Sequence, residues 1–313
     1  MTDVLPGQTA GIAVWNHLHG PSGGAGEVLA VYHRSLLWLP APDEPVTLSL
    51  DPGQRGPVVL EAVGDRERLQ AVGPGVPVVR AGPLLHFGAG LSVALGGVAL
   101  WDEPLPDLTP DGAGALADAI RRALSGDGSE GGSATRHGSF MGDLLRGEPP
   151  ATPWAQAGFP PAAALASALA AALASALAAA QAEAVTAAVA GLIGLGPGLT
   201  PGGDDFLAGV LAGLQCLGSP AARLLGDALE RSAGRTTALS RQFLRWAVRG
   251  RYGETVRGPF VAARAGMPAA AAIASLLAVG ATSGGDTAAG IWVGLSVARQ
   301  DPALPALLER IAP

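Results

Sequence analysis

Lysine is absent from this sequence, and all 20 basic residues among its 313 are arginines. Without lysine, a chain cannot form a lysine Schiff base, hold pyridoxal phosphate covalently or place a P-loop lysine on a phosphate. Any cationic side chain at a site must therefore be arginine. Arginine binds planar carboxylates and phosphates through a bidentate fork but does not shuttle protons.

Cysteine and charge are also scarce. The single Cys216 excludes an intramolecular disulfide and a multi-cysteine metal site, and its place late in an apolar helix predicts a core residue. Charged residues make up only 15% of the chain and the net charge is −6, which argues against nucleic acid or an anionic membrane as partners. The first residues lack the basic and apolar regions of a signal peptide, so we expect a cytoplasmic protein.

The pattern of residue types along the chain changes after about 100 residues, which predicts an α+β protein with two domains. Up to residue 110, short runs rich in β-branched and aromatic residues alternate with turn clusters, and they favour a barrel-like or antiparallel β-rich domain. GIAVWNHL, which begins at Gly11, and EVLAVYHRSLLWL, which begins at Glu27, are two of these expected strands. The remainder, 111–313, is predicted to be mainly α-helical, with a flexible Gly/Ser-rich connection over 125–138.

The segment 162–180 is uncharged and long enough to suggest a membrane span. We favour a core helix, because alanine is only weakly apolar and four leucines recur at four-residue spacing: Leu165, Leu169, Leu173 and Leu177. Further helices are expected over 204–217, 220–233, 236–249, 254–265, 268–280, 286–299 and 303–311.

The most specific motif is the glycine-rich run 194–209, GLGPGLTPGGDDFLAG. Its glycines allow the backbone to approach a ligand closely, and Thr200-Pro201 has the pattern of a helix cap followed by the first helical residue. The amides of 202–205 would then be free to bind an anion at the helix start. Asp204 and Asp205 lie in the same turn, where they could simply complement the helix dipole.

A second motif has the same pattern. In GATSGGDTAAG, residues 280–290, small hydroxyl residues and glycines precede Asp286 at the start of an apolar helix. The two helix starts could face each other and form one polar pocket. Asp204, Asp205 and Asp286 would then offer hard oxygen ligands suited to Mg²⁺, although each could equally be an ordinary cap.

Other candidates are weaker. Arg235 is followed by three hydroxyl residues and could bind phosphate or carboxylate, or lie on a solvated surface. His17 and His19 would share one face of a strand and could bind a metal ion, although an isolated pair of this kind is weak support. The run 20–24, GPSGG, matches the hydrolase elbow pattern, but a strand follows it where a helix is required, so we interpret it as a turn.

The run GLGPGLTPGGDDFLAG closely resembles the family of the AllH subunit of oxamate carbamoyltransferase. RTTALSRQFL and GATSGGDTAAG resemble two further blocks of that family in the right order, and the strand runs EVLAVYHRSLLWL and SVALGGVALWD are similar as well. The family pattern has a bulkier aromatic residue where this chain has Gly285, which affects the shape of the expected pocket.

The resemblance implies a role in allantoin-derived purine nitrogen catabolism, with companion subunits. The implied reaction exchanges oxalurate and phosphate with oxamate and carbamoyl phosphate, and small anions of this kind suit helix starts and arginine forks. The candidate catalytic residues, which are also the candidate metal ligands, are Asp204, Asp205 and Asp286. The candidate substrate-binding residues are Gly196, Gly198, Thr200, Gly202, Gly203, Arg235, Thr236, Thr237, Ser283, Gly284 and Thr287.

Two alternatives remain open. The Asp-bearing helix starts also resemble those of ADP-ribosylglycohydrolases, which are all-helical magnesium enzymes, so a Mg²⁺-dependent hydrolase is one alternative. The other is a non-catalytic binding or scaffold subunit, and a homo-oligomer is compatible with so uncharged a chain.

Overall fold

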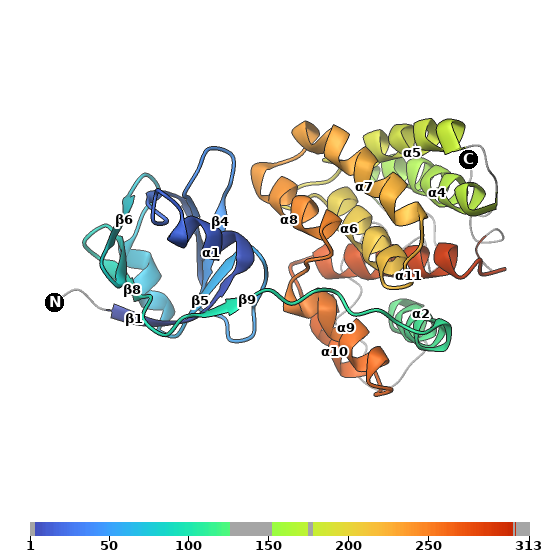
Figure 1. Ribbon diagram of the computed structural model, residues 1–313. Helices are drawn as coiled ribbons and strands as arrows, with labels where there is room; N and C mark the ends of the chain where they lie inside the picture. The colour runs from blue at the N-terminus through green and yellow to red at the C-terminus, as the bar shows by residue number, and fades with distance from the viewer. Residues whose placement is uncertain (1–3, 126–151, 175–177, 303, 305–313) are drawn as a thin grey trace. The chain divides into compact units, whose positions relative to one another are not determined.

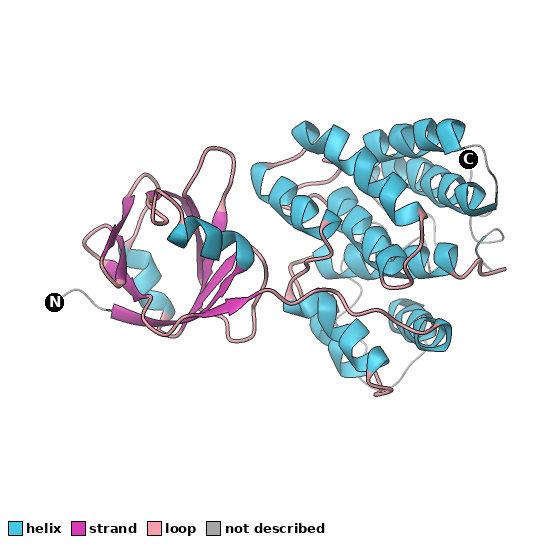
Figure 2. Ribbon diagram, viewed as in Figure 1, coloured by secondary structure: helices cyan, strands magenta, loops and turns pink. Residues whose placement is uncertain are grey.

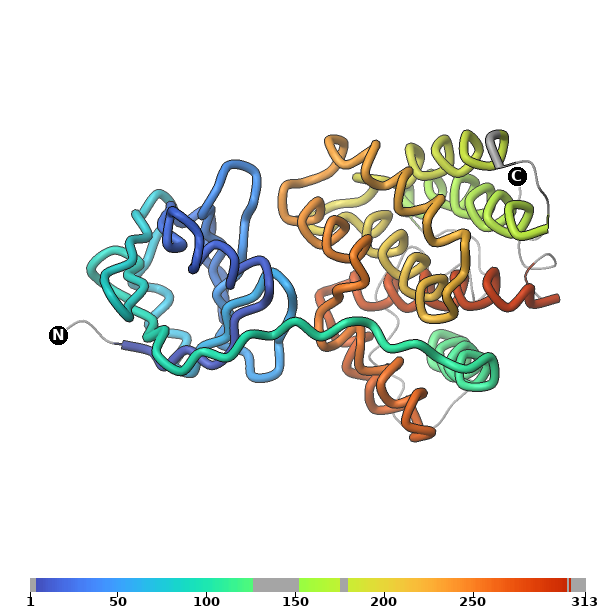
Figure 3. Tube along the Cα trace, viewed as in Figure 1, coloured from blue at the N-terminus to red at the C-terminus, as the bar shows by residue number. Residues whose placement is uncertain are grey.

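The structure is a computed structural model, and it describes residues 4–125, 152–174, 178–302 and 304. The chain forms two compact units: Met1–Pro104 with Arg251–Glu254, and Leu105–Gly250 with Thr255–Pro313. The Cα trace in Figure 3 allows the chain to be followed through both units. The predicted connection 125–138 and the predicted helix 303–311 lie outside the described residues, except Ser125 and Leu304.

The first unit is a closed β-barrel (Figure 1). Eight strands follow one another in the order β5-β4-β3-β2-β6-β7-β8-β1, and β1 also pairs with β5, which closes the barrel. Most pairs are antiparallel; β1 is parallel to β8 and β9, and β4 is parallel to β5. The strands are β1 (Val4–Gly11), β2 (Gly26–Val31), β3 (Ser35–Leu39), β4 (Val46–Ser49), β5 (Val59–Ala62), β6 (Pro77–Ala81), β7 (Leu84–Phe87), β8 (Leu91–Ala94) and β9 (Ala99–Trp101).

Two of the expected strands in this unit are wrong in detail. The run from Glu27 is not one strand, because the Tyr32 amide donates to the Ser35 carbonyl (2.8 Å) and closes a turn between β2 and β3. GIAVWNHL forms helix α1 (Ile12–His19) rather than a strand. Val14 and Leu18 are both buried, and their four-residue spacing suits a helix face, which outweighs the β propensity of the run.

The second unit is helical (Figure 2), so the predicted α+β class, β-rich first and helical second, is confirmed. The helices that the structure describes here are α2 (Pro110–Ser125), α4 (Pro153–Ala174), α5 (Ala178–Leu192), α6 (Gly202–Gln215), α7 (Ala221–Ser232), α8 (Ala238–Val248), α9 (Glu254–Arg264), α10 (Ala270–Leu277) and α11 (Ser283–Ala298), with the short 3₁₀ turn η2 (Ala233–Arg235) between α7 and α8. The helices from α6 to α11 lie within a few residues of the ranges predicted for them.

The alanine-rich segment 162–180 is divided between two helices. α4 starts before it and ends within it, and α5 begins at Ala178. Among the described residues, α4 is the one helix that is long and apolar enough to cross a membrane, and 39% of its most apolar window is buried. Leu165 and Leu169 lie in the core as predicted, Leu173 is half-buried, and Leu177 lies outside the described residues.

Candidate functional site

Helices α6 and α11 are packed backbone against backbone through glycines. A Cβ atom on Gly209 would lie 2.2 Å from the Thr287 carbonyl oxygen, and one on Gly290 would lie 2.1 Å from that of Phe206. Gly213 and Gly294 repeat the same contact one turn further along, against the carbonyls of Ile291 and Val210. Because the contacts advance in the same direction on both helices, α6 and α11 are parallel.

This packing places the two helix starts side by side, as the matching motifs predict. We call them the paired helix starts, meaning Thr200–Asp205 with α6 and Ser283–Thr287 of α11. The Thr200 and Ser283 hydroxyl oxygens lie 3.2 Å apart and join the two segments directly. Parallel helices bring their positive dipole ends together, so the potential at this point favours negative charge more than a single helix start would.

Asp204 is a buried structural carboxylate. Its exposed fraction is 2%, and its oxygens accept bonds from the Gly194 amide (2.8 Å), the Ser240 hydroxyl (2.6 Å) and the Thr236 hydroxyl. Burial raises the pKa of this carboxyl group, and the three donors partly oppose that rise. Asp204 thereby ties the glycine-rich loop, the start of α8 and the start of α6 into one unit.

Asp205 is different, although it is the next residue. The residue as a whole is half-buried, but its Oδ2 atom is buried and has no hydrogen-bond partner among the described residues. Desolvation raises its pKa well above the ordinary value, the Ser283 hydroxyl opposes that rise, and the charges of Asp286 and Asp204 add to it. A carboxyl group of this kind holds its proton to higher pH, and it can donate a hydrogen bond to an anion.

Asp286 and Thr287 complete the cluster from α11. Asp286 is fully buried and Thr287 is 7% exposed, so neither is as accessible as Thr200, Asp205 and Ser283. The charge of Asp286 contributes to the raised pKa of Asp205. The less buried residues bring together two hydroxyl groups and the carboxyl group of Asp205, and groups of these kinds can bind a small polar anion.

The glycines of the glycine-rich loop and of the start of α6 pack closely against neighbouring backbone. Gly194, Gly196 and Gly198 all have positive φ values, of 75°, 116° and 95°. A Cβ on Gly194 would lie 2.5 Å from the Arg235 carbonyl, and one on Gly203 would lie 2.0 Å from that of Leu192. The loop glycines are thus required by the fold itself. Gly202, Gly284 and Gly285 are buried beside them.

The expected cap is wrong, and so are three of the four amides that were expected to be free. Pro201, not Thr200, is the N-cap residue of α6, and its side chain makes no capping bond. The amides of Gly203, Asp204 and Asp205 donate to carbonyls of Leu195 and Pro201, so they are already used within the chain. The positive end of α6 remains, and nearby hydroxyl and carboxyl side chains can supply contacts that these three amides cannot.

The run that begins at Arg235 contains residues with different roles. Thr236 bonds Asp204, whereas the Thr237 hydroxyl caps α8 by accepting from the Ser240 amide (3.1 Å) and donates to the Leu199 carbonyl (2.5 Å). Arg235 has its backbone against Gly194 and its side chain exposed.

The remaining candidates take ordinary roles. No group of three or more His, Cys, Asp or Glu side chains in the described ranges is arranged to hold a metal ion. His17 lies 3.3 Å from Glu44, and the His19 ring stacks on Trp15, so the two imidazoles of α1 have separate partners. Residues 20–24 form a turn, as interpreted from the sequence. Cys216 is buried, which raises the pKa of its thiol to about 12.

Several residues that assemble the site are not among those predicted from the sequence. The glycine pairs 209/213 and 290/294 have a four-residue spacing in each helix, and that small-xxx-small pattern was the available signal for close helix packing. The role of Ser240 as a partner of Asp204 was also missed, because only the fold brings residues 36 positions apart together.

Comparison with known proteins supports the resemblance found in the sequence. No solved structure matches the chain significantly. One family model matches residues 192–295, about a third of the chain, and this segment contains both paired helix starts, Arg235 and the Asp204 network. The matching family is that of the oxamate carbamoyltransferase subunit AllH, so the predicted AllH-like identity of this segment is confirmed.

Proposed function

We propose that the chain is a subunit of an oxamate carbamoyltransferase-type complex and that its paired helix starts bind a small anionic substrate. The observation that carries the proposal is the parallel packing of α6 and α11, which gathers Thr200, Asp205 and Ser283 at two positive helix ends. The whole cluster lies within the segment that matches the AllH family. Oxamate, oxalurate, carbamoyl phosphate and phosphate are the ligands that this family suggests.

The raised pKa of Asp205 accounts for an anion site that contains carboxyl groups. A carboxylate would repel an anionic substrate, whereas a protonated carboxyl group donates a hydrogen bond to it. The hydroxyls of Thr200 and Ser283 donate or accept, which suits a ligand that has both a carboxylate or phosphate and an amide. Arg235 is the cation that approaches from the exposed edge of the loop.

Catalysis at such a site would depend on stabilising charge on the transferred carbamoyl group, not on a covalent nucleophile. In this scheme Thr200, Ser283 and Asp205 contact the ligand, and Asp204 and Asp286 position them. Companion subunits and the pathway of allantoin-derived nitrogen are part of the same proposal. The magnesium-dependent hydrolase and a role for Mg²⁺ stay predictions to be tested.

The test is a thermal-shift and calorimetric titration of the purified chain with oxamate, oxalurate, carbamoyl phosphate and inorganic phosphate, with and without Mg²⁺. We expect at least one of these anions to raise the melting temperature, because a ligand that binds only the folded state stabilises it by mass action. Asp205→Ala and Ser283→Ala should remove the shift, and Asp227→Ala at an exposed position on α7 should keep it. The proposal fails if none of the anions binds, or if the site variants bind as the wild type does.

A further inference from the structure

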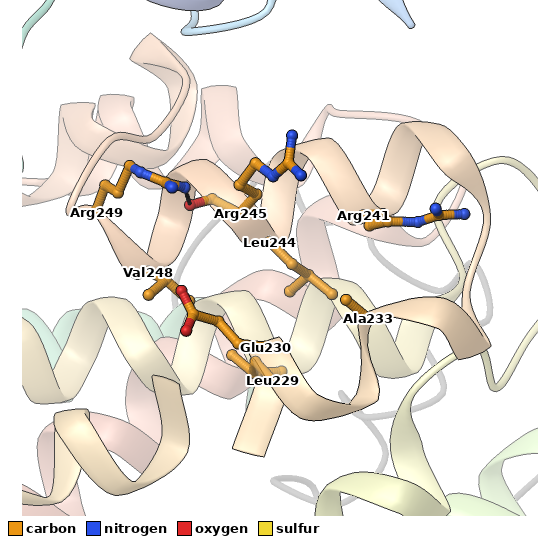
Figure 4. Close-up of a pocket in the computed structure, with 8 residues that line it drawn as sticks. All are labelled: Leu229, Glu230, Ala233, Arg241, Leu244, Arg245, Val248 and Arg249. Carbon is orange, nitrogen blue, oxygen red and sulfur yellow. Dashed lines mark hydrogen bonds between the residues drawn. The ribbon is translucent and has the colours of Figure 1, made fainter. Parts of the chain in front are cut away.

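A second charged feature lies on the helical unit and shares no residue with the paired helix starts. A cavity of about 280 Å³ lies between α7 and α8 (Figure 4), and we call it the arginine groove. Three arginines at four-residue spacing line it from α8, and one carboxylate lines it from α7. The lining residues are Leu229, Glu230, Ala233, Arg241, Leu244, Arg245, Val248 and Arg249.

The charge of the groove contrasts with that of the chain. Three guanidinium groups against one carboxylate give the lining a charge of +2, whereas the whole chain carries −6. Arg245 and Arg249 are exposed, and Arg241 is half-buried. The Arg249 guanidinium donates to the Arg245 carbonyl (2.7 Å) and lies 5.6 Å from the Trp246 ring centre, so its position is held from two sides.

The spacing of the arginines decides which kind of anion fits. Arg249, the C-cap residue of α8, follows Arg241 by eight positions, which at 1.5 Å per residue is about 12 Å along the helix. A single phosphate or oxamate is far shorter than that and could meet only one or two of the three guanidiniums. An extended chain with several carboxylates can meet all three, and arginine forks bind carboxylates in a bidentate manner.

The lining of the groove combines charged side chains with apolar ones. Leu229 and Leu244 are 2% and 4% exposed and offer little surface to a partner, whereas Ala233 and Val248 are half-buried and contribute some apolar surface beside the arginines. Arginine is among the residues that contribute most strongly to protein interfaces, and complementary charge guides association. We propose that the arginine groove is a docking surface for an acidic segment of a partner polypeptide.

The test measures binding of a fluorescein-labelled peptide of ten glutamates to the purified chain by fluorescence anisotropy, with a ten-glutamine peptide as the neutral probe. We expect the glutamate peptide to bind and the glutamine peptide not to bind. The double variant Arg245→Gln/Arg249→Gln should weaken binding at least tenfold. The matched control is Arg121→Gln/Arg122→Gln on α2, which removes the same charge from two exposed arginines and should leave binding unchanged.

A third variant should strengthen binding of the glutamate peptide where the arginine variant weakens it. Glu230→Gln removes the one carboxylate from the lining and should tighten binding of the glutamate peptide. The proposal is overturned if the glutamate peptide does not bind, if the groove and control variants weaken binding equally, or if Glu230→Gln weakens it. It is also overturned if inorganic phosphate displaces the peptide better than sodium chloride of equal ionic strength, since the groove would then be a small-anion site. None of these results depends on anion binding at the paired helix starts.

Discussion

At the scale of single residues, Asp204 and Asp205 have different roles because successive residues of a helix point in different directions and meet different neighbours. Asp204 faces three donors and is satisfied, so its removal would leave the Gly194 amide and the Thr236 and Ser240 hydroxyls without their acceptor. Each buried unsatisfied donor costs roughly 1–3 kcal/mol. We therefore expect Asp204→Ala to lower the free energy of unfolding by about 3 kcal/mol.

Urea denaturation measures this loss, and Asp227→Ala is the matched control, because Asp227 is an exposed aspartate on α7. The control should change the free energy of unfolding by less than about 0.5 kcal/mol. Equal losses in the two variants would contradict the structural role of Asp204.

Asp205 should give the protein a pH-dependent stability of a definite sign. Its pKa is raised above the ordinary value of 3.8, chiefly by desolvation. An acid with a higher pKa in the folded chain favours folding below its unfolded pKa, and this contribution is lost as the pH rises through the folded pKa. Wild-type protein should therefore lose stability relative to Asp205→Asn as the pH rises from 3.8 towards neutrality.

Paired urea curves at a series of pH values measure that difference. Asp227→Asn, at an exposed position on α7, is measured in parallel. If the Asp205→Asn difference were constant with pH, the assignment of a raised pKa to Asp205 would be wrong.

Residue types could be predicted at the site, but their partners could not. Thr200, Asp205 and Ser283 were all named from the sequence, because glycine, hydroxyl and carboxyl residues before an apolar run indicate a polar helix start. Which aspartate faces the interior depends on where α8 packs, and Ser240 reaches Asp204 only in the fold. Local patterns therefore identify the chemistry, and tertiary packing decides which group is accessible.

At the scale of elements, the position of the site depends on how closely α6 and α11 approach. Gly290→Ala would place a Cβ near 2.1 Å from the Phe206 carbonyl, which forces the helices apart. Alanine in a helix gains up to about 1 kcal/mol over glycine, but overpacking costs about 1–3 kcal/mol or more, so the steric term should exceed the gain. We expect a net loss of about 2 kcal/mol and weaker anion binding.

Gly226→Ala on α7 is the control for this prediction. Its Cβ would meet Val248 at 3.6 Å, an ordinary contact, so the helix propensity should dominate and stability should stay level or rise. Chemical denaturation of both variants measures the contrast. If both substitutions stabilise the protein, the close approach of α6 and α11 is not what the glycines provide.

The elements themselves were largely predictable where periodicity was long. The helices from α6 to α11 lie close to their predicted ranges, because apolar residues recur along several turns. The type of short segments is harder to predict. Helix α1 has only eight residues, so the four-residue spacing of Val14 and Leu18 occurs once and is outweighed by the β propensity of its β-branched residues. Closure of the barrel by β1 and β5 joins segments about 50 residues apart, which no local pattern indicates.

At the scale of the whole molecule, each compact unit has its own buried core, and the candidate site lies entirely in the helical one. Separate cores can unfold separately, so we expect calorimetry to show two transitions. Leu60→Ala removes a fully buried side chain from β5 and should lower one transition, since such truncations cost about 2–5 kcal/mol. Gly290→Ala should lower the other.

Calorimetry in the presence of carbamoyl phosphate then tests which of the two units binds this ligand. At about 100 times its dissociation constant a ligand stabilises the folded state by about 2.7 kcal/mol, and only the unit that binds it gains this energy. The transition lowered by Gly290→Ala should therefore rise, while the transition lowered by Leu60→Ala stays in place. A rise in the barrel transition instead would move the site out of the helical unit. A single transition lowered by both substitutions would show that the two units unfold together.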